Sequence, residues 1–495
     1  MRRWLLSREM AIVLLVLVIV SFNRDWKMAF RSSGIDPRNR VVGARLLEAG
    51  KDPYFYRWQE GDPLEWLDPG VLPTDSVNRC TVAPTLLGLY LPAANLPFPV
   101  QRKIWTLIQW ALLALVAWTL SSQAKDSYQR RTVLLWFVIA FVTSECWRMH
   151  TERGQIYVLQ AALLALSAWS YRKSESKGPL VAGLLAGVAA GLRPPCAVVA
   201  LPFLLAKKWR FLGALVVGVL LTLSSSFLWA GKQTWTSYAK AMEIHGRRHL
   251  RLADWPNDKF AAAVKKELPK LLKDTELHRL FRTGDGVLAV VEEGADQERI
   301  EKHIRETLAP RVGEAPYKVT FSHLYPEKAE GEGLEKWQLF PIGSSGFVRF
   351  FRDLGTPHRL QLMKLLTVLF LLSYGGILMQ QTKGELPPRV LFIIGTALPV
   401  MVEYLLPAPR YLYNNIGWCV PVALLLLQVG PAKVLRGVSG VLLTIGLVGA
   451  NGIVSAAWGD LRLSGPLLFA AFAMIGWQLV RSPEFRESGW NEGEE

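Results

Sequence analysis

Long apolar runs separated by short basic turns dominate the chain. A helix needs about 20 mostly apolar residues to cross a bilayer, and helices satisfy their own backbone groups in lipid. The pattern therefore predicts an all-α polytopic membrane protein with about 11–13 transmembrane helices. The predicted spans are Met10–Phe22, Val82–Leu96, Ile104–Leu120, Val133–Cys146, Ile156–Trp169, Leu180–Leu192, Ala197–Ala206, Phe211–Trp229, Leu360–Met379, Val390–Leu405, Tyr411–Leu427, Val438–Ile453 and Pro466–Val480.

A long hydrophilic segment interrupts this series. Its periodicity predicts helices over Asp258–Lys273 and Asp296–Leu308 and strands over Gly286–Val291 and Tyr317–Phe321, which indicates a small α+β insertion. We expect an N-terminal transmembrane module (1–230, with a first outer loop at 24–80), an extracytoplasmic insertion (231–359), C-terminal transmembrane helices (360–480) and a polar cytoplasmic tail (481–495).

The composition agrees with a membrane protein and explains the charge. Hydrophobic residues make up 51% of the chain, and the formal net charge is +16. Basic cytoplasmic loops and contact with anionic lipid headgroups account for this charge without nucleic acid as a partner. We expect a multi-pass protein of the inner or plasma membrane.

Basic turns also predict the orientation. Turns such as Lys207–Arg210 read as cytoplasmic, which places the insertion, Gly154 and Asp36 on the outer side. Three apolar runs separate the first helix from Gly154, although an even number is required. Either Val82–Leu96, which contains two prolines, is re-entrant, or the basic segment Lys125–Arg131 violates the charge rule.

Cysteine and histidine give no sign of a metal site. The four cysteines are scattered and the seven histidines form no HExxH pattern, so we predict neither a disulfide framework nor a bound metal.

The candidate chemistry begins with Asp36, in Ser33–Pro37 just after the first span. A carboxylate held at the membrane surface beside the amphipathic run Val41–Gly50 can accept a proton from a sugar hydroxyl. Asp36 also fits as the N-cap of the helix that follows it, with Pro37 at the first helical position. Of two other aspartates, Asp25 resembles a headgroup-level anchor and Asp52 a turn former.

Four motifs together carry a family resemblance. They are Asp36 with Val41–Gly50 and Asp52-Pro53-Tyr54, then Gly154-Gln155-Ile156-Tyr157, then Ala189–Pro195, and the basic turn Lys207–Arg210. In this order, over residues 36–210, they resemble the GT-C superfamily of polyprenyl-phosphate-sugar-dependent glycosyltransferases, and most of all glycosyltransferase family 87. Tyr157 stands where that family usually has Asn, and the insertion is longer than the family suggests.

The resemblance implies a reaction. A hexose such as mannose would be transferred, with inversion, from a polyprenyl-phosphate donor to a lipid or glycan acceptor at the extracytoplasmic face. The product would belong to the cell envelope. Asp36 would be the general base. The lipid-linked sugar would be the donor, and no further cofactor is expected.

Four polar residues are candidates to bind the donor phosphate. A departing phosphate requires cations, and Arg193, Arg410 and Arg153 lie at predicted outer helix ends, where arginines can alternatively bind lipid phosphate. The amide of Gln155 can bond a sugar or a phosphate, or it can cap a helix.

The remaining candidates are sugar contacts. Glu403 lies near the end of an apolar run, where it either pairs with Arg410 or positions substrate. Asn414 begins the next helix, where an amide either reaches a cavity or bridges helices. Trp58 and Trp66 lie in the first outer loop and can stack on a sugar or belong to an interfacial belt.

Two other functional classes compete with a transferase. A lipid or glycan transporter or flippase would show repeated topology and charges deep in the bilayer, and a non-catalytic envelope assembly protein would need no outer carboxylate. Replacing Asp36 separates these classes from an enzyme.

Overall fold

The computed structural model describes residues 6–31, 34–59, 61–68, 77–78, 80–254, 277–282, 286–291, 294–312, 318–322, 359–381, 386–406, 411–430, 434, 437–451 and 464–481. Within these residues, four helical segments are long and apolar enough to cross a membrane, and a fifth is added if one bent helix pair counts as a span. The predicted all-α polytopic membrane fold is confirmed.

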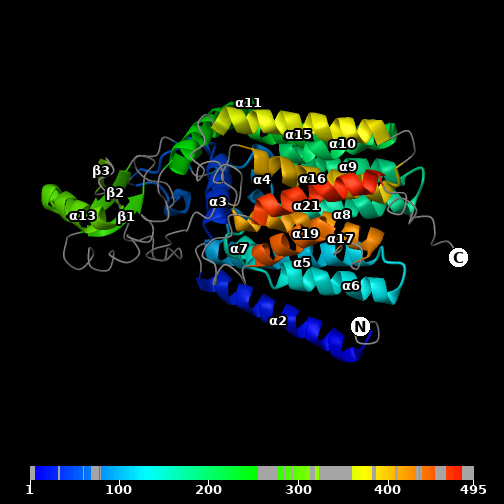
Figure 1. Ribbon diagram of the computed structural model, residues 1–495. Coiled ribbons are helices and arrows are strands. Elements are labelled where there is room, and N and C mark those ends of the chain that lie inside the picture. The colour runs from blue at the N-terminus through cyan, green and yellow to red at the C-terminus, as the bar shows by residue number, and fades with distance from the viewer. Residues whose placement is uncertain are drawn as a thin grey trace.

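The long helices run side by side as a bundle (Figure 1). The first part of the chain forms α2 (Arg8–Arg31), α5 (Phe98–Ser121), α6 (Ser127–Phe137, extended by the π-helical turn Val138–Val142), α7 (Glu145–Glu152), α8 (Tyr157–Lys173), α9 (Gly178–Leu192), α10 (Ala200–Leu205) and α11 (Trp209–Asp254). The second part forms α15 (Arg359–Gln381), α16 (Pro388–Leu405), α17 (Cys419–Val429), α19 (Gly437–Asn451) and α21 (Ser464–Arg481). Short 3₁₀ segments occupy Pro194–Val199 and Leu412–Trp418.

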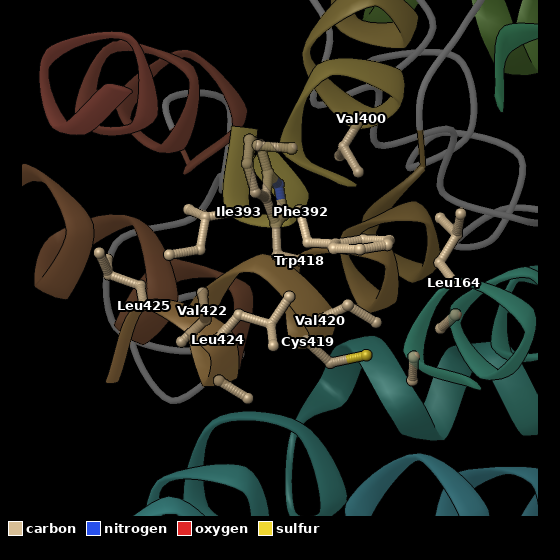
Figure 2. Close-up of a cluster of buried hydrophobic side chains, with 14 of the residues drawn as sticks. Leu164, Phe392, Ile393, Val400, Trp418, Cys419, Val420, Val422, Leu424 and Leu425 are labelled. Carbon is tan, nitrogen blue, oxygen red and sulfur yellow. The ribbon is translucent and has the colours of Figure 1, made fainter. Parts of the chain in front are cut away.

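The core of the bundle surrounds α16 and α17. The apolar window of Pro388–Leu405 is 94% buried, whereas that of Trp209–His245 is 22% buried, so α16 is central and α11 is peripheral. Figure 2 shows the side chains of Phe392 and Trp418 within this apolar cluster. The C-terminal helices therefore support the N-terminal module from inside the bundle rather than forming a separate unit.

Small residues bring α9 and α11 into close contact. A Cβ atom on Gly183 or Gly187 would lie 2.1 Å from a backbone oxygen of α11, and one on Gly218 would lie 2.4 Å from the oxygen of Leu184. Glycine at four-residue spacing is a common way for membrane helices to approach this closely, because their association depends on packing rather than on hydrophobic burial.

The predicted span Val82–Leu96 is wrong. This segment forms only two short helices, α4 (Pro84–Leu87) and the 3₁₀ turn Leu91–Ala93, because prolines interrupt it. The chain between Asp36 and Gly154 therefore crosses the bundle twice, through α5 and then α6. The parity conflict is resolved in favour of a non-crossing 82–96 segment, and the basic segment 125–131 does not need to violate the charge rule.

The insertion contains a three-stranded sheet at the end of the molecule where α3 (Ile35–Glu48) lies (Figure 1). Strand β1 (Leu277–Arg282) pairs antiparallel with β2 (Gly286–Val291), which pairs parallel with β3 (Lys318–Ser322), and α13 (Gln297–Val312) connects the parallel strands. Two predicted strands and one helix thus appear where expected, and β1 was missed. The predicted helix 258–273 lies outside the described residues.

Candidate active site

Helix α3 (Ile35–Glu48) carries the first candidate residue and is enclosed by the protein. Residues 37–46 are all buried, although the run Val41–Gly50 is amphipathic in sequence. The helix follows Gly34, whose φ of 54° is left-handed, and a Cβ atom there would lie 2.6 Å from Nε of Arg102. Glycine at this position allows the start of α3 to approach the buried Arg102 of α5.

Asp36 does not cap α3. The cap residue is Gly34 and no side-chain cap hydrogen bond forms, so the N-cap alternative is wrong. The carboxylate instead faces the turn between α7 and α8. Its Oδ2 accepts a hydrogen bond from Nε2 of Gln155 and lies 3.0 Å from Nε of Arg153. Within the described part of the chain, Oδ1 of Asp36 has no recorded partner, and the side chain is 22% exposed.

Gly154 allows the turn between α7 and α8 to pack on α3. Its φ is 61°, and a Cβ atom would lie 2.3 Å from Cγ of Pro37. Its carbonyl oxygen accepts hydrogen bonds from Arg40 Nη1 (2.9 Å) and Trp105 Nε1 (3.0 Å). The proline after Asp36 and the glycine before Gln155 therefore fit against each other, which sets the distance between the two polar side chains.

Arg40 is a site residue that the sequence reasoning missed. It is buried, and its Nη2 donates to Oε1 of Gln155 at 2.9 Å, which turns the amide nitrogen of Gln155 towards Asp36. The sequence spacing could have identified Arg40, because it lies one helical turn after Asp36 and so shares the same face of α3. Gln155 does not cap α8, whose N-cap is Ile156.

A second ion pair lies beside this cluster. Nη2 of Arg193, at the end of α9, lies 2.5 Å from Oε1 of Glu403 in α16. Glu403 was expected to pair with Arg410, which lies outside the described residues. Within the described residues Glu403 pairs with Arg193, because the end of α9 lies against α16, a contact that no local pattern reveals.

Three tyrosines connect the two ion pairs. The guanidinium of Arg193 lies 4.0 Å from the ring centre of Tyr157, and that of Arg153 lies 5.2 Å from Tyr411 and 5.5 Å from Tyr413. The rings of Tyr157 and Tyr413 are 5.7 Å apart. A cation over an aromatic face is attracted by the ring, so the tyrosines help the carboxylates to hold both guanidiniums in place. The site is therefore a continuous row of carboxylates, guanidiniums and rings at one end of the bundle.

Asn414 lies next to this row. Its Oδ1 accepts from the backbone nitrogen of Tyr411 at 2.8 Å, so it caps the local 3₁₀ turn. Its Nδ2 is buried and has no hydrogen-bond partner within the described residues. This amide nitrogen is available to an incoming acceptor atom.

The outer-loop tryptophans lie elsewhere. Trp66 belongs to the 3₁₀ turn Leu64–Trp66, whose Glu65 carbonyl binds Arg45, near the far end of α3 from Asp36. Nε1 of Trp58 donates to the Pro63 carbonyl at 3.1 Å within the same loop. The structure thus does not bring these two rings to Asp36.

The two rival aspartates have local roles. Asp25 of α2 is buried and pairs with Arg24 at 2.9 Å. Asp52 accepts from the backbone nitrogens of Tyr54 (2.8 Å) and Phe55 (3.1 Å), as expected of a turn former. Across the described ranges, no three His, Cys, Asp or Glu residues form a group with metal-ligand geometry.

One family model matches the chain. It is glycosyltransferase family 87, over residues 83–267, a range that includes Arg153, Gln155 and Arg193 but not Asp36. No curated protein and no solved structure matches. The predicted resemblance to family 87 is therefore confirmed over residues 83–267, and this match supports a membrane glycosyltransferase.

Proposed function

We propose that the protein transfers a hexose such as mannose from a polyprenyl-phosphate donor to a hydroxyl of a lipid or glycan acceptor, with inversion, and that Asp36 is the general base. The family match supports a glycosyltransferase, and the geometry around Asp36 supports this role.

A single observation carries the proposal. Gln155 and Arg153 both hold Oδ2 of Asp36, and no described residue occupies Oδ1. A general base must be fixed in position and still have a free lone pair within hydrogen-bond reach of the proton that it removes. Asp36 meets both conditions among the described residues, because one oxygen is anchored and none of these residues blocks the other from an acceptor hydroxyl.

The reaction balances on these groups. The acceptor oxygen attacks the anomeric carbon from the face opposite the phosphate and forms the new glycosidic bond. The bond from the anomeric carbon to the phosphate oxygen breaks, and its electron pair leaves with the polyprenyl phosphate. The hydroxyl proton moves to Oδ1 of Asp36. The leaving group gains one negative charge, which calls for cations at the phosphate.

Arg153 and Arg193 are the proposed cations. Each is paired with a carboxylate in the structure, Arg153 with Asp36 and Arg193 with Glu403. A phosphate that binds Arg153 competes with Asp36 for the same guanidinium. Donor binding would then weaken the ion pair between Asp36 and Arg153. Arg410, next to Tyr411 in sequence, remains a proposed third cation.

The sugar would lie over the tyrosine row. Tyr157 and Tyr413 offer aromatic faces between the two arginines, and Nδ2 of Asn414 is a donor for a sugar hydroxyl. Trp58 and Trp66 remain predicted sugar contacts, near the other end of α3. We further propose that this end of the bundle is extracytoplasmic, in an inner or plasma membrane.

The test compares Asp36→Asn with Asp52→Asn in full-length protein reconstituted in liposomes. The substrate is a radiolabelled polyprenyl-phosphate mannose, and the readout is transfer to extracted lipid acceptors. We expect Asp36→Asn to lower the transfer rate about 10²–10⁴-fold at similar protein yield, because the base is lost. Asp52→Asn should retain activity, since Asn also forms such turns.

Two outcomes would contradict the proposal. Normal transfer by Asp36→Asn would remove the carboxylate from the chemistry. Movement of labelled donor across the bilayer without transfer by the wild type would favour a flippase.

A further inference from the structure

The turn between α10 and α11 has an unusual backbone. Lys207 has a φ of 54° and is the one non-glycine residue with positive φ that the described ranges contain. Its backbone nitrogen donates to Leu204 (3.0 Å) and that of Lys208 donates to Phe203 (2.9 Å), which is a Schellman helix end. Glycine usually occupies this left-handed position. A lysine there carries some backbone strain and places a cation at the turn.

An apolar groove lies directly beside this turn. It has a volume of about 510 Å³ and is formed between the first turns of α9 and the first turns of α11. Its interior includes Leu184 of α9 and Gly213 and Val217 of α11, while Trp209 and Arg210 line the end nearest the turn. Gly213 opens the groove, because a Cβ atom there would meet nothing within 4 Å.

Cations stand at this end of the groove on both helices. Arg210 precedes Gly213 by three residues and Val217 by seven, so it shares the groove face of α11. Lys177 precedes two lining residues of α9, Leu180 and Val181, by three and four residues. Lys177, Lys207 and Arg210 are all exposed, and Glu175 is the exposed carboxylate of the neighbouring turn. The groove therefore has an apolar body and a cationic end, which matches a phosphate headgroup attached to an acyl chain.

The exposed indole of Trp209 agrees with this reading. Its residue surface is 63% exposed at the same end of the groove. Tryptophan concentrates at headgroup level, and arginine binds phosphate with two parallel hydrogen bonds. The groove begins at the start of α9, whereas Arg193 of the candidate active site follows its end, so the two sites lie at opposite ends of this helix.

We propose that this groove binds one anionic glycerophospholipid, with its phosphate held by Arg210, Lys177 and Lys207 and an acyl chain between α9 and α11. The site is separate from the proposed donor site, and the proposal does not depend on the transfer reaction. A lipid here would fill the gap between the ends of two closely packed helices.

The test measures lipid retention by native mass spectrometry of the full-length protein in detergent. Phosphatidylglycerol and phosphatidylcholine are titrated separately. We expect one phosphatidylglycerol to bind at least about tenfold more tightly than phosphatidylcholine. Gly213→Leu should abolish this tight binding, since the leucine fills the groove. Gly376→Leu on α15, where a Cβ atom also meets nothing within 4 Å, is the matched control and should retain it.

Charge variants complete the design. Arg210→Ala should weaken the binding of phosphatidylglycerol about tenfold. Lys207→Gly should also weaken this binding, without lowering the unfolding temperature of the protein. Lys173→Ala, which removes a cation that covers Trp169 at the same end of the bundle, is the control.

Three results would overturn the proposal. They are equal affinity for the two lipids, unchanged binding in both Gly213→Leu and Arg210→Ala, and displacement of phosphatidylglycerol from the groove by tighter-binding polyprenyl phosphate. The last result would make the groove a donor-lipid site. Variant unfolding temperatures near that of the wild type ensure that lost binding reflects the groove.

Discussion

At the residue scale, the candidate site depends on two glycines, which have no side chain, as much as on its polar residues. Gly34 and Gly154 allow α3 to approach Arg102 and the turn between α7 and α8. Asp36 and Gln155 meet because Pro37 fits against Gly154. Arg40 then fixes the orientation of the Gln155 amide.

Gly154→Ala is predicted to lower transfer about 10²-fold, because displacing the turn by about an ångström moves Gln155 away from Asp36. The left-handed φ and the contact of 2.3 Å with Pro37 both oppose a side chain. Gly50→Ala is the control, since Gly50 has a φ of 68° with open space around its Cβ position. Similar activity losses in the two variants would attribute the effect to backbone strain alone.

Cys80 is predicted to resist maleimide at pH 8 in the folded protein. Burial raises the pKa of this thiol to about 12, and the thiolate is the reactive form. A raised pKa keeps the group protonated until the pH approaches it, so reaction should appear only on unfolding. Mass spectrometry of labelled peptides, with and without denaturant, provides the measurement. Rapid labelling of native protein would show that α3 opens readily.

At the element scale, the junction of α9 and α11 holds Arg193 in position. The two helices approach through glycines, and Arg193 follows the last turn of α9. A substitution that disturbs the packing of α9 on α11 should therefore displace Arg193 and so alter the candidate site.

Gly187→Ala is predicted to destabilise the protein by about 1–3 kcal/mol, because its Cβ atom would lie 2.1 Å from the Leu215 carbonyl oxygen. Thermal unfolding in detergent provides the measurement. Gly376→Ala on α15 adds the same methyl group in open space and should change stability little. An unfolding temperature for Gly187→Ala equal to that of the control would mean that α9 and α11 are not closely packed.

At the scale of the whole molecule, the Arg193–Glu403 pair joins the N-terminal and C-terminal helices. Breaking a buried pair from one side leaves an uncompensated charge, which costs about 3–5 kcal/mol. We expect Arg193→Gln to destabilise the protein more than the double variant with Glu403→Gln does. A double-mutant cycle on unfolding free energies measures this coupling, and additive effects would show that the pair is not formed.

The bundle also has two chemically distinct ends. The candidate site and the sheet lie at one end (Figure 1), and the basic turns before α9 and α11 lie at the other. We predict that a cysteine at exposed Gln59 reacts with a membrane-impermeant maleimide added outside intact cells. A cysteine at exposed Ser176, in the turn before α9, should react only after permeabilisation. The reverse pattern would invert the proposed orientation.

The sequence by itself determined the features that depend on local periodicity. Apolar runs identified the membrane class, and the alternation around 286–291 and 317–321 located two strands of the insertion. The motifs at Gly154-Gln155 and at the end of α9 pointed to family 87. These features depend on neighbouring residues and short-range hydrogen bonds, so they can be predicted from the local sequence.

Only the tertiary structure decided which distant residues meet. Asp36 and Gln155 are 119 positions apart, and they meet because the chain between them crosses the bundle through α5, comes back through α6, and so places the α7–α8 turn against α3. The pairing of Glu403 with Arg193, 210 positions away in the sequence, has the same origin. Coulomb and hydrogen-bond partners are selected by proximity in space, and proximity depends on the whole path of the chain.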